Sequence, residues 1–216
     1  MNETKIPEKL KLPSLKRIFD IKISVLLFLI SIPFLLILLI WIFIEQLFIR
    51  SSRGSIFYSE LRVSQGQEFK FYKFRIFKQK VLDKVMKDTG FIHTKPLEQD
   101  PKNMTGYGRF LKRVYMDEFP QLFNVLKGDM TLVGPRPTNV FNSTKMREAG
   151  DYSKEIMKCG LTGLVQINKG KMKHEVKNMD MLYIDYIKNN SGWKIVFYDL
   201  KILYYTVVAV FQAKGL

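Results

Sequence analysis

The densest group of residues that could do chemistry lies between positions 116 and 137, which read MDEFPQLFNVLKGDMTLVGPRP. Two adjacent carboxylates, Asp117 and Glu118, are followed by Arg136, which stands between two prolines in residues 134–137. Because proline fixes its own φ, the turn around Arg136 is stiff, and the planar fork of arginine matches phosphate oxygens. A carboxylate with such a cation nearby suits chemistry on a phosphate, since it can attack phosphorus or bind Mg²⁺.

Asp117 also has a purely structural interpretation. A helix is predicted to begin near Pro120, because proline is tolerated in the first helical turn, and to end at Gly128. An acidic residue just before such a helix is a good N-cap, so capping is the simpler role for Asp117 taken alone. A helix N-terminus holds phosphate oxygens equally well, so both roles stay open at this point. Cations also precede the pair at Arg109, Lys112 and Arg113.

The composition restricts the classes of partner and site. The 216 residues include 35 Lys and Arg against 20 Asp and Glu, a formal net charge of +15. Such a charge attracts nucleic acid, anionic lipid head groups or phosphorylated substrates, with solubility as the simpler explanation. The single cysteine, Cys159, excludes an internal disulfide and fits a reducing compartment. His93 and His174 are the only histidines, so we expect neither a zinc site nor a catalytic Cys–His pair.

The elements that must position these residues begin with an apolar run at residues 23–44, which contains no charged side chain. A straight helix of this length would rise roughly 33 Å, enough to cross a bilayer core. Pro33 is expected to kink it, and Ser31 could hydrogen-bond a carbonyl that the kink frees. Basic residues flank both ends, and positive charge marks the cytoplasmic side of a membrane. A re-entrant helix that returns to the same side and a kinked span therefore both stay open.

The rest of the chain predicts an α/β domain in which helices dominate. Turns and strand are expected over residues 51–80, where aromatic and cationic residues alternate, then a short helix and loop over 81–108. Further helices are expected over residues 144–158 and 180–188, with a loop over 160–170. Residues 193–211 are apolar and aromatic but are interrupted by Lys194, Asp199 and Lys201. That interruption favours a helix in the membrane interface or on the protein body over a second span.

Several ordered motifs cover nearly the whole chain. They are KRIFD at 16–20, KFR at 73–75, GRFLK at 108–112, DEFPQL at 117–122, NVLKGD at 124–129, LVGPRP at 132–137, GLTG at 160–163 and QIN at 166–168. In this order and spacing the chain resembles the monotopic bacterial polyprenyl-phosphate phosphoglycosyl transferases, the initiating sugar transferases of glycan assembly. Eight motifs together are far more specific than any one of them.

The resemblance implies a reaction and the residues that perform it. Members transfer a phosphosugar from a UDP-sugar to a polyprenyl phosphate (undecaprenyl phosphate) and release UMP, the first membrane step in the assembly of surface glycans such as capsules. Asp117 is then the nucleophile that forms a covalent aspartyl-phosphosugar and binds Mg²⁺, with Glu118 as its partner. The further candidates for phosphate binding are Arg136, Lys112, Arg75, Lys73 and Arg109.

The resemblance also implies where the chain lies. The segment with Ser31 and Pro33 corresponds to a re-entrant membrane helix on the cytoplasmic face of the plasma or inner membrane. We therefore expect residues 1–50 to form a basic arm and the re-entrant helix. Residues 51–216 are expected to form a cytoplasmic catalytic domain on the membrane, with a small sheet and an interfacial C-terminal helix. The expected partners are a UDP-sugar, polyprenyl phosphate and membrane lipid, without nucleic acid, and a homodimer is one assembly open to test.

The chain departs from the family pattern at two places that matter here. Ile32 precedes Pro33 where the family often has serine, and Tyr115-Met116 replaces the usual Ser-Leu before the carboxylate pair. Such differences leave the transferred sugar and the glycan pathway open. Two other classes of function are also open: a membrane-anchored polyanion binder, which explains the charge but not the motifs, and a scaffold of the same fold without catalysis.

Overall fold

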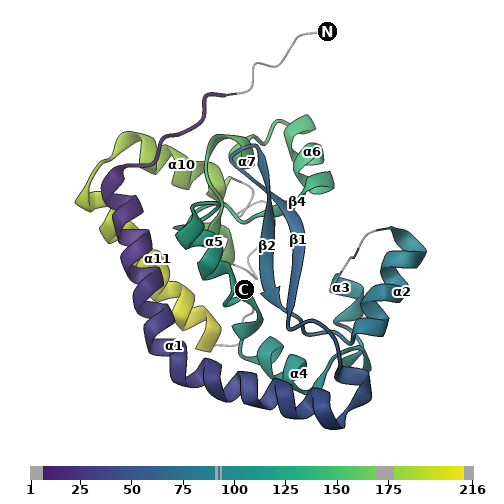
Figure 1. The fold of residues 1–216 in the computed structure, drawn as a ribbon. Helices are drawn as coiled ribbons and strands as arrows, with labels where there is room; N and C mark the ends of the chain where they lie inside the picture. Colours follow the sequence, from purple (N-terminus) through teal and green to yellow (C-terminus); the bar gives the residue numbers. More distant parts are fainter. Residues whose placement is uncertain (1–6, 91, 93, 169–177, 212–216) are drawn as a thin grey trace. The chain divides into compact units, whose positions relative to one another are not determined.

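A computed structural model describes residues 7–90, 92, 94–168 and 178–211 (Figure 1). Helices dominate and the strands are few, which confirms the expected fold class. The helices are α1 (Ser14–Phe48), α2 (Gln79–Thr89), α3 (Thr94–Leu97), α4 (Gly106–Arg113), α5 (Gln121–Lys127), α6 (Val140–Glu148), α7 (Ser153–Ile156), α8 (Leu164–Ile167), α10 (Met179–Asn189) and α11 (Trp193–Phe211). The strands are β1 (Phe57–Ser64), β2 (Gln67–Phe74), β3 (Thr131–Val133), β4 (Thr138–Asn139) and β5 (Gly160–Thr162). Short 3-10 turns are η1 (Arg50–Ser52), η2 (Pro101–Asn103) and η3 (Met116–Glu118).

The chain forms two compact units. Unit 1 contains the described residues of Met1–Leu27, Glu60–Phe71 and Gln121–Leu216, and unit 2 contains Phe28–Ser59 and Tyr72–Pro120. Helix α1 and the strands β1 and β2 contribute residues to both units. The division predicted at residue 50, between a membrane part and a cytoplasmic part, concerns the membrane and stays a prediction.

Helix α1 is long and apolar enough to cross a membrane, and no other helix of the described residues is. In unit 2, Leu38, Ile42 and Glu45 are buried along one face at helical spacing, while the side chains of Ile37 and Phe43 are 67% and 68% exposed. An apolar surface of this extent indicates contact with lipid or with another apolar partner. Pro33 lies inside α1 and is exposed; the kink stays a prediction. Ser31 makes no hydrogen bond to any described residue.

Strands β1 and β2 form a hairpin, as the strand prediction for residues 51–80 requires. Gln65 and Gly66 connect them, with φ of 51° and 70°; two consecutive residues with positive φ suit the tight turns that match the twist of a hairpin. In unit 1, β1 pairs antiparallel with β4, with Arg62 opposite Asn139. Residues 134–137 therefore lie directly before a strand that is fixed by β1.

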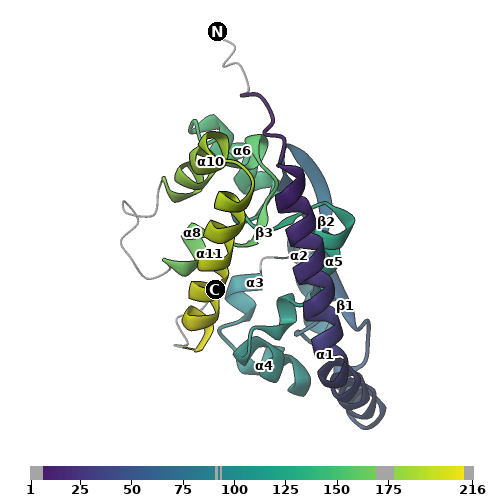
Figure 2. The ribbon, with the colours of Figure 1, turned by 90° about the vertical axis from the view of Figure 1, so that its left-hand side faces the viewer.

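The core of unit 1 contains a second pairing that the sequence did not indicate. Strands β3 and β5 are parallel, with Thr131 opposite Gly160 and Val133 opposite Thr162. The loop expected over residues 160–170 is therefore wrong for β5 and for α8, while Lys169 and Gly170 lie outside the described residues. A strand of three residues has too little local signal to predict, because its pairing partner stabilises it. Helices α8, α10 and α11 lie beside one another in this unit (Figure 2).

The helix predictions hold best where the ends carry local signals. Helices α10 and α11 lie where the sequence placed them, and α5 ends before Gly128, whose φ is 92°. The single helix expected over residues 144–158 is instead two helices, α6 and α7. Gly150 separates them with a φ of 83°, a conformation that stops a helix and that glycine adopts without strain.

A buried polar network fastens the start of α1 to the body of unit 1. The Nζ of Lys16 donates to Asp199 of α11 at 2.6 Å, and it lies 3.5 Å from Asp20. Tyr183 of α10 donates to the second oxygen of Asp199 at 2.5 Å, and Thr131 of β3 donates to Asp20. All five side chains are buried. Asp199, which interrupts the apolar pattern of α11, thus faces the protein body.

The core of unit 2 holds α4 against α1 and β2. Its buried members are Leu38, Ile42, Phe74, Ile76, Phe77, Leu82, Met104, Tyr107 and Leu111. The carboxylate of Glu45 accepts from the backbone N–H groups of Gly106 at 2.7 Å and Tyr107 at 2.8 Å, and Thr105 caps Gly108 at 2.9 Å. A side chain on Gly108 would overlap the carbonyl of Ile76. These contacts satisfy the free N–H groups at the start of the helix that carries Lys112.

Candidate active site

Asp117 lies in the 3-10 turn η3, not at the cap of a longer helix. No backbone N–H of the described residues donates to its carboxylate, and α5 begins only at Gln121, so the interpretation of Asp117 as the cap of this helix is wrong. The turn is preceded by Tyr115 in the left-handed conformation, with φ of 58°. A bulky residue in that region is uncommon and mildly strained, and such strain gathers at functional sites.

The carboxylate of Asp117 is buried and unpaired. Its side chain is only 3% exposed, and it forms no hydrogen bond or ion pair with any described residue. Burial, together with the neighbouring charge of Glu118, raises the pKa of Asp117 to about 6, against the opposing charges of Lys73 and Lys112. Burial destabilises the charged form of a carboxyl group. Asp117 is therefore a carboxylate that the protein has desolvated without supplying a direct partner.

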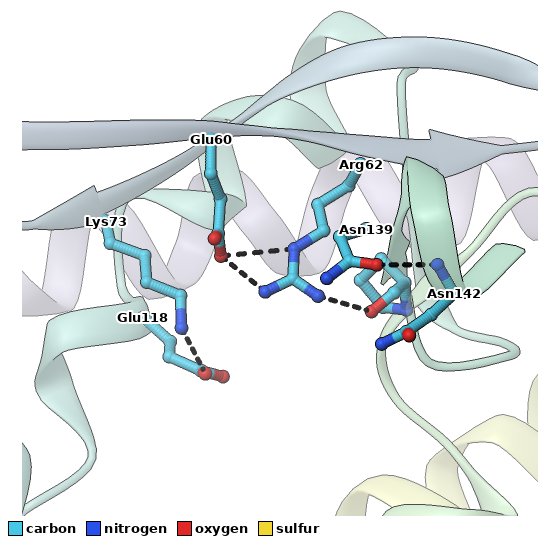
Figure 3. A network of polar contacts seen from close by, with 7 residues as sticks. Glu60, Arg62, Lys73, Glu118, Asn139 and Asn142 are labelled. Atoms are coloured by element: carbon cyan, nitrogen blue, oxygen red, sulfur yellow. Dashed lines mark hydrogen bonds and ion pairs between the residues drawn. The ribbon is translucent and has the colours of Figure 1, made fainter. Parts of the chain in front are cut away.

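Two lysine–glutamate pairs flank Asp117. The Nζ of Lys73 on β2 lies 3.1 Å from Glu118 (Figure 3), and the Nζ of Lys112 on α4 lies 3.1 Å from Glu98, which follows α3. Both lysines are close enough to lower the pKa of Asp117. Unit 2 thus brings together three carboxylates and two ammonium groups.

Asp117 borders a small cavity of unit 2, with a volume of about 20 Å³, which is close to the space that one water molecule needs. Glu98 and Lys73 also line it. Mg²⁺ prefers one or two carboxylates, with waters and substrate phosphates as its other ligands. Among the described residues no cluster of three His, Cys, Asp or Glu could hold a metal ion.

Arg75, a candidate for phosphate binding, has a structural task in this fold. Its three guanidinium nitrogens donate to the backbone carbonyls of Ser55, Phe77 (2.6 Å) and Ser52 (2.8 Å), and the residue is 1% exposed. Burial lowers the pKa of Arg75, while the charges of Tyr107 and Glu45 act in the opposite direction. Because the residue is buried, its guanidinium is not accessible to a phosphate in this conformation. Arg109, in contrast, is exposed on α4.

Arg136 belongs to unit 1, in the turn between β3 and β4. The turn is fastened by its backbone: Gly134 N–H donates to Thr162 at 2.9 Å, and Gly160 N–H donates to Pro135 at 2.8 Å. A side chain on Gly160 or Gly163 would overlap the backbone of Gly134. The GLTG motif is therefore glycine-rich because it packs directly against the LVGPRP motif.

Arg62 supports the same turn from β1. Its guanidinium pairs with Glu60 and donates to the carbonyl of Pro137 at 3.4 Å (Figure 3). On the other side of the turn, Asn139 accepts from the N–H of Asn142 at 2.8 Å and so caps α6. Arg136 itself is half-buried, on a turn whose two ends are both held by strand and helix contacts.

Unit 2 thus contains every predicted site residue except Arg136. Four of them form the charged cluster: Asp117, Glu118, Lys73 and Lys112. Sequence reasoning missed Glu98, which lies in a stretch predicted only as helix and loop. It also missed Glu45, whose place at the end of an apolar run suggested a boundary and not a helix cap. No local sequence pattern marks either residue, because Glu98 pairs with Lys112 and Glu45 accepts hydrogen bonds from Gly106 and Tyr107, which are distant in sequence.

Comparison with known proteins places the chain in a family. A family model described as bacterial sugar transferase matches residues 12–213. The chain is 34% identical over 213 residues to the undecaprenyl-phosphate galactose phosphotransferase of Salmonella typhimurium, covering 93% of this chain and 41% of that protein. It is 32% identical to the UDP-glucose:undecaprenyl-phosphate glucose-1-phosphate transferase of Escherichia coli, with 93% and 41% covered.

A shorter relative is matched over most of its length. The exopolysaccharide production protein ExoY of Rhizobium meliloti is 34% identical, with 93% of this chain and 87% of that protein covered. The chain thus spans about two fifths of the two longer relatives and nearly the whole of this one. With the family model matching almost the entire chain, the protein belongs to the bacterial sugar transferase family.

Proposed function

We propose that this protein is a phosphoglycosyl transferase that moves a phosphosugar from a UDP-sugar to undecaprenyl phosphate and releases UMP. The observation that carries the proposal is the buried, unpaired carboxylate of Asp117 between two lysine–glutamate pairs. The class of substrates comes from the relatives: the Escherichia coli protein is named for UDP-glucose and undecaprenyl phosphate, and the Salmonella typhimurium protein for undecaprenyl phosphate and galactose.

The reaction proceeds in two displacements at one phosphorus atom. An oxygen of Asp117 attacks the phosphorus that carries the sugar, and the bond from that phosphorus to the bridging oxygen of UMP breaks. UMP leaves with the bridging oxygen, and an acyl phosphate links Asp117 to the phosphosugar. A phosphate oxygen of the lipid then attacks the same phosphorus, and the bond to Asp117 breaks, which restores the carboxylate.

The residues around Asp117 support this chemistry electrostatically. With a pKa of about 6, the carboxylate is mostly ionised at neutral pH, yet it is 3% exposed, so little water has to be removed before it attacks. Lys112 can donate to oxygens of the diphosphate, because an ammonium group has three N–H donors and Glu98 is its one described carboxylate partner. Lys73 adds a second positive charge that is close enough to act on Asp117. Such preorganised cations stabilise the charge that develops on the leaving UMP.

We further propose that Mg²⁺ serves the reaction, with Asp117 as its ligand and Glu118 or Glu98 as its nearest carboxylate neighbours. The ion would neutralise diphosphate oxygens. Since Asp117 borders a small cavity shared with Glu98, the protein supplies few ligands and the substrate phosphates supply others. Arg136, on the stiff turn of unit 1, remains the candidate for a further phosphate or nucleotide contact.

For the membrane we propose a re-entrant α1 on the cytoplasmic face of the plasma membrane. Support comes from the exposed apolar side chains of α1 and from the basic residues at both of its ends. The exposed aromatic residues of α11, among them Trp193, Phe197 and Tyr204, support an interfacial position for that helix.

The test is release of UMP in the absence of the lipid acceptor. The purified protein is mixed with UDP-sugars one at a time, in Mg²⁺, and UMP is measured over a single turnover. We expect a burst equal to the enzyme concentration with one of them, and sugar label on the denatured protein that hydroxylamine removes. Asp117→Asn should show neither, whereas Asp185→Asn, an exposed position on α10, should behave as the wild type.

Three results would count against the proposal. Release of UMP by Asp117→Asn would exclude this residue as nucleophile. Release that occurs only when undecaprenyl phosphate is present would favour direct transfer without a covalent intermediate. Failure of the wild type with every UDP-sugar, with and without the lipid, would favour a scaffold that lacks catalysis.

A further inference from the structure

Glu98 occupies a place in unit 2 that none of the sequence motifs covers. It follows α3, its carboxylate lies 3.1 Å from Lys112, and it borders the same small cavity as Asp117. The negative charge of Glu98 contributes to the raised pKa of Asp117. This glutamate is therefore part of the immediate surroundings of the proposed nucleophile.

The choice of partners in this cluster is informative. Two lysines and three carboxylates lie together, and the buried aspartate would gain most from a cation, because burial makes an unpaired charge costly. Yet Lys73 pairs with Glu118 and Lys112 pairs with Glu98, while Asp117 pairs with neither. The two glutamates engage the lysines that would otherwise be the natural partners of Asp117.

An unpaired carboxylate matters for a nucleophile. An ammonium group in contact with a carboxylate stabilises its negative charge and withdraws the electron pair that must attack phosphorus. The same lysines are nevertheless needed close by, since the diphosphate brings negative charge that they can neutralise. The site thus requires cations that are near Asp117 but not bound to it.

We propose that Glu98 is a positioning residue that keeps Lys112 away from Asp117 until a diphosphate occupies the site. Glu98 holds Lys112 beside the nucleophile, on the rigid α4, with N–H donors left for phosphate oxygens. Without Glu98, the ammonium group of Lys112 forms an ion pair with Asp117 and makes its carboxylate a weaker nucleophile. Glu118 does the same for Lys73 on the opposite flank. The inference rests on the proposed function, because it takes Asp117 as the nucleophile.

The test is a double-mutant cycle on the chemical step. Glu98→Gln, Lys112→Met and the double variant are compared with the wild type in single-turnover release of UMP. We expect Glu98→Gln to slow the release about tenfold, the order of effect of one well-placed ion pair on a carboxylate, without weaker binding of UMP in calorimetry. In the Lys112→Met background, Glu98→Gln should change the rate less than twofold, because no lysine is left to mask Asp117.

A control and a second variant keep the result interpretable. Lys127→Met breaks a pair of similar length in unit 1, between the exposed Lys127 and the half-buried Asp129 at 3.2 Å, and should leave the rate unchanged. Glu98→Asp keeps the charge and should recover part of the rate that Glu98→Gln loses. Bound UMP in each variant shows that its site is folded.

Several outcomes would overturn the inference. They are an unchanged rate in Glu98→Gln, an equal slowing in both backgrounds, and a loss that appears only in the affinity for UMP. Failure of the wild type to release UMP at all would instead refute the proposed function, so the two failures are distinguishable.

Discussion

Replacing Asp117 with asparagine should stabilise the folded protein while it abolishes the proposed reaction. The carboxylate is 3% exposed and has no direct partner, so its ionisation opposes folding. Asparagine has nearly the same shape and carries no charge. A proposed nucleophile that the protein has desolvated is thus expected to reduce stability, as strained functional groups commonly do.

The magnitude follows from the raised pKa. Burial and, next, the charge of Glu118 raise the pKa of Asp117 to about 6, from an ordinary value of 3.8. A difference of about 2 corresponds to roughly 3 kcal/mol, at about 1.4 kcal/mol for each pKa unit. The folded protein keeps this proton up to about pH 6, whereas the unfolded chain loses it near pH 4. Stability is therefore lost as the pH rises through this window.

The assay is thermal unfolding in detergent and EDTA at pH 4.5 and pH 7.5. At pH 7.5 we expect Asp117→Asn to melt about 6–12 °C above the wild type, since 1 kcal/mol moves the melting temperature of a chain of this size by roughly 2–4 °C. At pH 4.5 the difference should shrink to roughly a third, about 1 kcal/mol, because the folded protein keeps the proton there while the unfolded chain has already lost most of it. The matched control is Asp180→Asn, which removes the 2.5 Å partner of the buried Lys154 and should lower the melting temperature.

Equal melting temperatures of the wild type and Asp117→Asn at pH 7.5 would refute the reasoning. So would a variant that is less stable at pH 7.5. Either result would mean that the carboxylate is solvated or paired in solution. A stabilisation of the same size at both pH values would point to a cause other than ionisation.

Other consequences concern the membrane and the packing of single residues. Burial raises the pKa of the Cys159 thiol to about 12, so maleimide should label the native protein only at introduced cysteines. Cysteines that replace Glu8 and Arg53 in turn should be labelled from the same side of sealed vesicles. Labelling from opposite sides would exclude a re-entrant α1. Gly108→Ala should destabilise the protein by at least about 2 kcal/mol in chemical denaturation, because the new methyl group overlaps the backbone carbonyl of Ile76. An unchanged denaturation midpoint would contradict the close contact between Gly108 and that carbonyl. Trp193, 64% exposed on α11, should be quenched by lipids brominated near the head group once the other tryptophan is replaced by phenylalanine; emission unaffected by any brominated lipid would place α11 in water.

Local signals were enough to predict much of this protein from its sequence. The apolar run of α1, the glycine that ends α5 and the spans of α10 and α11 all depend on patterns within a few residues of one another. The carboxylate pair at Asp117 and Glu118 also stands out, because the two residues are adjacent. Composition and ordered motifs then sufficed to place the chain in its family.

Tertiary structure decided the features that join distant segments. Strand β5 exists because β3 pairs with it. The guanidinium of Arg75 is engaged by hydrogen bonds to three backbone carbonyls. Asp117 does not cap a helix, since η3 intervenes before α5. Glu98 meets Lys112 only after α3 and α4 have packed in unit 2. Burial and pairing of charge depend on neighbours in space, so the electrostatic state of Asp117 could be known only from the fold.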